Sequence, residues 1–138
     1  MSDELVTVWA DWSRGTIRPT TRIRERVYFD HPTITEFCVQ LEYNLAAGER
    51  DARADWRAVA RFDHNVHPQR GHDIRAEGLH LDVYPGTTAE ETVREFRVVS
   101  LSRAPAFCRE FLETNRVALL AAYERLSGIP PAERYYDD

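Results

Sequence analysis

The ten residues TEFCVQLEYN (35–44) alternate between two kinds of side chain along their whole length. One set is apolar and the other mostly polar: Phe37, Val39, Leu41 and Tyr43, against Glu36, Cys38, Gln40 and Glu42. Because successive side chains of a strand point to opposite faces of a sheet, this period of two predicts a strand with one buried and one polar face. The polar segment LAAGERDARAD (45–55) follows and is typical of a hairpin loop.

Further strands are predicted on both sides of this hairpin. They lie at 4–12, 22–29, 56–64 and 78–85, with a last strand near 94–101. In RIRERVYF (22–29) the apolar residues share one face, and Arg22, Arg24 and Arg26 share the other. These three residues are called the arginine stripe below.

The apolar period changes to that of a helix from Pro105 onward. Pro105 suits a first turn, and Gly128 with two prolines after it suits a helix end. These signals predict one helix of roughly 22 residues, about 33 Å long. Strands first and a helix last favour an α+β fold, an antiparallel sheet of five or six strands packed on one long C-terminal helix. We expect a single domain over residues 1–128 and a flexible C-terminal tail over 129–138.

Charge is spread unevenly along the chain. All 18 basic residues are arginine, and the net charge is −5. Residues 14–26 carry five Arg and one Glu, or +4, so the remainder carries −9. This pattern predicts a specific anionic partner rather than nucleic-acid binding over the whole surface. An acidic N-terminus and no run of ~20 apolar residues predict a cytoplasmic protein without membrane contact, with Cys38 and Cys108 as reduced core residues.

Four of the five histidines lie in RFDHNVHPQRGHDIRAEGLHLDVY (61–84). If the strands at 56–64 and 78–84 are neighbours, alternation predicts which side chains share each face. The face toward the helix would hold Trp56, Ala60, Phe62, Leu79, Leu81 and Val83. The open face would hold Arg57, Arg61, Asp63, His80, Asp82 and Tyr84, with the arginine stripe beside them.

Three interpretations of this region remain open. The first is a metal-dependent enzyme, whose ligands for zinc or another divalent transition metal would come from His64, His67, His72, Glu77 and His80. Their spacing matches none of the familiar metal-binding motifs. The second is a non-catalytic binding or assembly module, in which the polar loop binds no small ligand.

The third interpretation is a metal-free acid–base site. Imidazoles titrate near neutrality, so His72 and His80 could exchange protons while Arg61 holds a phosphate. Cleavage of RNA by its own 2′-hydroxyl needs such a pair together with fixed positive charge. Asp82 or Asp63 would orient a histidine by accepting a hydrogen bond from its second nitrogen.

The run VARFDHNVHPQRGHDI (59–74) resembles toxins of the TumE type, which are found beside an antitoxin gene. Arg61, Phe62 and Asp63 match the end of a strand in that family, and Gly71 and His72 match the loop after it. The resemblance covers residues 55–126, and the histidines are more spread out here. The run is equally similar to uncharacterised proteins of haloarchaea and high-GC bacteria, which imply no activity.

The toxin resemblance implies a chain that acts on RNA or translation and is neutralised by an antitoxin. Our leading hypothesis is therefore a small toxin-like ribonuclease that needs no cofactor. In it His80 is the base, His72 or His67 the acid, and Asp82 orients His80. Phosphate binding falls to Arg61 and Arg24, with Arg22, Arg26 and Tyr84 as further substrate-binding residues. The sequence leaves the oligomeric state open.

Overall fold

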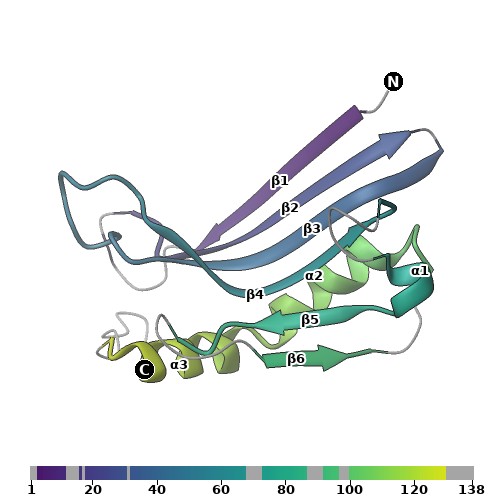
Figure 1. The fold of residues 1–138 in the computed structure, drawn as a ribbon. Helices are drawn as coiled ribbons and strands as arrows, with labels where there is room; N and C mark the ends of the chain where they lie inside the picture. Colours follow the sequence, from purple (N-terminus) through teal and green to yellow (C-terminus); the bar gives the residue numbers. More distant parts are fainter. Residues whose placement is uncertain are drawn as a thin grey trace.

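Six strands form one antiparallel sheet in the order in which they occur in the chain (Figure 1). This computed structural model describes residues 3–11, 16, 18–30, 32–67, 73–86, 92–96 and 100–129. The strands are β1 (Asp3–Asp11), β2 (Thr21–Asp30), β3 (Thr33–Asn44), β4 (Trp56–Asn65), β5 (His80–Val83) and β6 (Thr92–Glu95). An antiparallel sheet with C-terminal helices confirms the α+β class.

The predicted single C-terminal helix is wrong. Two shorter helices replace it, α2 (Ala104–Thr114) and α3 (Arg116–Ser127), and both lie along one face of the sheet (Figure 1). At Asn115 the backbone leaves the helical region, with φ −101° and ψ 7°. The side-chain Nδ2 of Asn115 donates to the carbonyl of Phe111 at 2.9 Å. Asparagine competes in this way with regular helical hydrogen bonding, so the helix is interrupted where the apolar period continues.

The core lies between the helices and the face of the sheet that they cover. Alternation in β3 is confirmed, because Phe37, Val39 and Leu41 are at most 1% exposed. Cys108 and Leu112 of α2 pack into the same cluster and are fully buried. Each large apolar side chain buried here contributes about 1.5–3 kcal/mol to folding.

A β-bulge in β4 overturns part of the predicted facing. Leu41 pairs with Ala60, but Glu42 pairs with Ala58, so Val59 is an extra residue in β4. The residues before the bulge therefore point to the face opposite to the one that uninterrupted alternation through β4 would give them. Arg57 pairs with the buried Tyr43 on the helix side, while Trp56 lies on the open face under Arg22. Both placements are the reverse of the prediction, whereas Arg61 and Asp63 lie beyond the bulge on the open face.

One helical turn, α1 (Ile74–Glu77), precedes β5. Asp73 caps it by accepting a hydrogen bond from the backbone N–H of Arg75 at 2.9 Å. Its end is at Gly78, whose φ of 80° is accessible to glycine at little cost. Ile74 is buried in the core and anchors the turn to the sheet.

The end of the chain is described as far as Ile129. This residue packs against the core and donates its backbone N–H to the carbonyl of Glu124 at 2.9 Å. The rest of the predicted tail, 130–138, lies outside the described residues. Within the described part of the chain, no helix has the length and apolar character needed to cross a bilayer.

Candidate functional site

The face of the sheet opposite the helices, which we call the open face, gathers the charged and aromatic side chains of four strands. On β2 these are the arginine stripe and Tyr28, and on β3 they are Glu36, Cys38, Gln40 and Glu42. On β4 they are Trp56, Arg61 and Asp63, and on β5 and just beyond it His80, Asp82 and Tyr84. The register sets two rows across the sheet, Arg24–Gln40–Arg61–Asp82 and Arg26–Cys38–Asp63. Neighbouring strands are about 4.8 Å apart, so each row brings its side chains within reach of one another.

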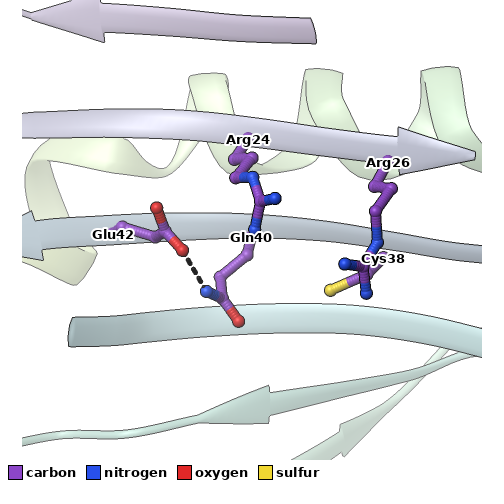
Figure 2. A pocket seen from close by; sticks show the side chains of 5 residues that line it. All are labelled: Arg24, Arg26, Cys38, Gln40 and Glu42. Carbon is purple, nitrogen blue, oxygen red and sulfur yellow. Dashed lines mark hydrogen bonds between the residues drawn. The ribbon is translucent and has the colours of Figure 1, made fainter. Parts of the chain in front are cut away.

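Arg22 is held by contacts within the protein. Its Nε donates to Glu42 at 2.5 Å, and its guanidinium carbon lies 4.0 Å from the centroid of the Trp56 ring. The amide of Gln40 donates to the other carboxylate oxygen of Glu42 (Figure 2). Stacking on the indole and pairing with a buried carboxylate fix Arg22 in place, and the charge of Glu42 offsets that of its guanidinium.

Arg24 and Arg26 are not held by an ion pair within the described residues as Arg22 is. Figure 2 shows both side chains reaching from β2 across β3, toward Gln40 and Cys38. Neither guanidinium forms an ion pair with another residue of the described ranges, although Arg26 lies 5.5 Å from the centroid of the Tyr28 ring. Each arginine carries five N–H donors in a planar fork that matches phosphate oxygens. Two fixed positive charges are thus available side by side on the open face.

Arg61 adds a third positive charge from β4. Its Nη2 donates to the hydroxyl of Tyr84 at 2.6 Å, and its Nε lies 3.8 Å from the carboxylate of Asp63. That Nε is buried and makes no hydrogen bond to any residue that the structure describes. Tyr84 and Asp63 therefore orient the guanidinium of Arg61 on the open face.

A cavity of about 200 Å³ opens where β3 begins and β4 ends. Its lining consists of Arg26, Glu36, Phe37, Cys38, Arg61, Asp63, His64 and Asn65. Burial raises the pKa of the Cys38 thiol to about 11, against the opposite influence of Arg61 and Arg26. Cys38 is thus protonated near neutral pH and is a poor nucleophile there. It lies on the open face, not in the core as predicted, whereas Cys108 is a core residue.

The described histidines do not converge. His64 points into the core, stacks on Phe37 at 5.5 Å between ring centroids, and accepts the backbone N–H of Ile74 at its Nδ1. His67 is exposed just after β4. His80 lies on the open face, with its Nε2 3.6 Å from the carboxylate of Glu95. The predicted acid His72 lies outside the described residues.

The described residues do not form the metal site that the sequence suggested. No group of three or more His, Cys, Asp or Glu side chains there could hold a metal ion. Glu77 accepts from the backbone N–H of Asp73 at 3.1 Å, away from the core position of His64. Of the proposed ligands that the structure describes, only His80 lies on the open face with the arginines.

Sequence reasoning did not include Trp56, Tyr28, Gln40 and Glu42 among the functional candidates. For the last three, the signal was present in the alternation of β2 and β3, which places them on the face of the arginine stripe. For Trp56 no such signal exists, because its facing depends on the bulge at Val59.

Comparisons with known proteins give one match. Residues 9–129 match the model of a family described as a domain of unknown function, DUF7718. No curated protein is detectably similar to the chain. No solved structure is detectably similar to it either. Because the family model spans most of the sequence, including β2 to β5 and both C-terminal helices, the chain belongs to the DUF7718 family.

Proposed function

We propose that the open face binds single-stranded RNA. The observation that carries the proposal is a cluster of three arginines on the open face. Arg24 and Arg26 form no ion pair with another described residue, and Arg61 lies in the same row of the sheet as Arg24. Single-stranded nucleic acids are bound by positively charged surfaces that track the backbone, with aromatic rings for stacking. Tyr28 lies beside Arg26 and Tyr84 beside Arg61, so two rings accompany these charges, while the ring of Trp56 is stacked against Arg22.

The acidic charge of the whole chain restricts where RNA can bind. With a net charge of −5, most of the surface repels a polyanion, so binding depends on a local cluster of positive charge. The pairing of Arg22 with Glu42 removes one stripe arginine from that cluster. Arg24 and Arg26 therefore carry most of the phosphate contacts from β2.

The test is fluorescence anisotropy of a labelled single-stranded RNA of about 12 nucleotides over a range of salt concentrations. The double variant Arg24→Gln/Arg26→Gln should lose at least about tenfold in affinity. Because each lost phosphate contact lowers the log–log salt slope by about 0.7 for single strands, that slope should fall by about 1.4. The control Arg57→Gln/Arg125→Gln removes the same charge from exposed positions off the open face and should bind as the parent chain does. An equal loss in both double variants, or no binding at 50 mM salt (about the low end of the usual range), would refute the proposal.

Cleavage of the bound RNA is a second, separable part of the proposal. His80 is the one imidazole that the described ranges place on the open face, and Glu95 at 3.6 Å is a carboxylate that can orient it. It lies two residues from Asp82, or about 7 Å along β5 from the row that contains Arg61. We propose His80 as the base that removes the 2′-hydroxyl proton, with Glu95 in the orienting role that the sequence suggested for Asp82.

Labelled RNA incubated with the chain separates binding from cleavage. His80→Ala should abolish cleavage while affinity stays within about twofold, because the phosphate-binding arginines are unchanged. The TumE-type toxin role and its antitoxin partner remain predictions. They require growth arrest on expression that His80→Ala relieves, and arrest that persists in this variant would contradict the role of His80.

A further inference from the structure

Strand β1 forms an edge of the sheet, and its acidic residues Asp3, Glu4 and Asp11 lie at its two ends, so that residues 5–10 carry no charge. It pairs with β2 over nine consecutive residues with no register shift, and Asp3–Asp11 contains no proline and no basic residue. Leu5, Val6 and Val8 are 54%, 41% and 46% exposed. Long, regular apolar edges are templates for pairing with another strand, and proteins normally interrupt them with charges, proline or bulges. The other edge, β6, has only four residues and carries the exposed Arg94 and Glu95.

The exposed apolar side chains of β1 point to both faces of the sheet. Val6 and Val8 lie beside Arg26 and Arg24 on the open face, whereas Leu5 lies beside the buried Val27 on the helix side. A helix or loop laid over one face would leave the other side uncovered. An added strand contacts both faces at once and can also pair with the outward backbone groups of residues 5–10, so the edge fits a strand.

We propose that two copies of this chain associate through antiparallel pairing of β1 with β1 about a twofold axis at Thr7. This register is the one that pairs all nine residues. It sets Val6 opposite Val8 of the second copy and Leu5 opposite Trp9, so that apolar side chains meet on each face. The contact is isologous, as expected for a twofold dimer.

Charge favours this register as well. Glu4 meets the small, uncharged Ala10 of the second copy. Asp3 meets Asp11, whose carboxylate is already paired with Arg116 at 2.9 Å, so the guanidinium offsets one of the two negative charges at each end. Parallel pairing in register would instead set each Asp3 and Glu4 against its own counterpart, and like charges directly opposite are destabilising.

The dimer would have a twelve-stranded sheet whose two remaining edges are copies of β6. Because these edges are short and charged, association stops at two copies instead of continuing into a filament. On the open face one row would run Arg26–Val6–Val8–Arg24, the last two residues from the second copy. The two arginine stripes would then lie about 14 Å apart across the joined sheet. The association itself does not depend on RNA binding.

The mass of the full chain in solution, measured by light scattering after gel filtration, tests the proposal. The expected value at about 100 µM, within the affinity range of small interfaces, is twice 16.0 kDa. Val6→Lys/Val8→Lys puts four like charges across the axis and should give a monomer with an unchanged circular dichroism spectrum. The control Val117→Lys changes a valine on α3 that is 64% exposed and should stay dimeric. A monomeric parent chain, or a folded Val6→Lys/Val8→Lys chain that stays dimeric, overturns the proposal.

Cross-linking tests the register even if the lysine variant does not fold. In a Cys38→Ser background, Thr7→Cys places two thiols next to the axis, and a short bismaleimide should join two chains. Cys108 is fully buried and should not react. Val117→Cys in the same background should give no cross-linked dimer. Equal cross-linking at positions 7 and 117 would show random collision and would rule out the β1 interface.

Discussion

The guanidinium of Arg22 is stacked on the indole of Trp56 while it donates to Glu42, so one side chain joins β2, β3 and β4 on the open face. The carboxylate of Glu42 is almost fully buried, and Gln40 is its second donor. Arg24, the next member of the arginine stripe, has no such ion pair in the described structure. Alternate residues of one strand thus differ in their surroundings: Arg22 is held by contacts within the protein, and Arg24 is a ligand-binding residue only in our proposal.

We predict that Arg22→Ala lowers the free energy of unfolding by about 2–4 kcal/mol. The reason is that Glu42 would remain buried with a neutral amide as its remaining donor, and an uncompensated buried charge is costly. Arg24→Ala should change the same quantity by less than about 0.5 kcal/mol. Urea unfolding followed by tryptophan fluorescence measures both. Similar values for the two variants would contradict this division of roles.

His64 should matter for stability, and His67 should not. The His64 ring is 1% exposed, stacked on Phe37, and its Nδ1 accepts the N–H of Ile74 at 3.1 Å. His64→Ala leaves a cavity and an unpaired buried N–H, and should cost about 3–5 kcal/mol. His67→Ala removes an exposed ring and should cost less than about 0.5 kcal/mol. Chemical denaturation measures the free energy of unfolding of both variants. If His64→Ala leaves this free energy unchanged, α1 does not depend on this contact.

The N-cap of α1 should give a small, pH-dependent contribution to stability. Hydrogen bonds from Arg75, chiefly from its side chain, lower the pKa of Asp73 from 3.8 to about 2. A carboxylate with a depressed pKa in the folded state stabilises that state above its unfolded value, and the contribution is lost as the pH falls through about 2. Asp73→Ala should cost about 1 kcal/mol at pH 7, and Asp73→Asn should retain most of the cap.

The measurement is the free energy of unfolding of the parent chain and Asp73→Ala from pH 7 down to pH 2. The difference between them should be constant above about pH 4 and should shrink below it, because only the parent chain has this carboxylate to protonate. A difference that grows toward low pH has the opposite sign and would exclude the capping carboxylate as its source.

The strands could be predicted because apolar and polar side chains alternate over most of β2 and β3. A period of two over so many residues is typical of a strand and of no helix. The break between α2 and α3 could not be predicted, because both sides of Asn115 continue the same apolar period. The prediction that Trp56 faces the helices was wrong for a different reason. Small apolar residues occupy both parities at 58–60, so the pattern does not show the bulge at Val59 that turns Trp56 to the open face.

For the candidate site, the arginine stripe and the open-face positions of Arg61 and Asp63 follow from alternation and agree with the register. The core position of His64 was missed, although it is the last residue of the predicted strand at 56–64, because it was counted among the candidate metal ligands. β4 continues to Asn65, and parity within the longer strand turns the His64 ring into the core. The partners that distinguish Arg22 from Arg24 depend on the bulge and on side-chain rotamers, which strand periodicity does not encode.

Gly86 should be intolerant of a side chain because α3 ends against it. A Cβ added there would lie 2.8 Å from the carbonyl carbon of Leu126 and 2.9 Å from its oxygen, and these backbone atoms cannot rotate away as a side chain could. Gly86→Ala should therefore lower the free energy of unfolding by about 1–3 kcal/mol. Gly48 is the matched control, since a Cβ there meets nothing within 4 Å. Gly48→Ala should be neutral or stabilising by up to about 1 kcal/mol, because alanine restricts the unfolded chain. Thermal unfolding of the two variants compares them directly, and equal melting temperatures would mean that α3 can shift away from residue 86 at little cost.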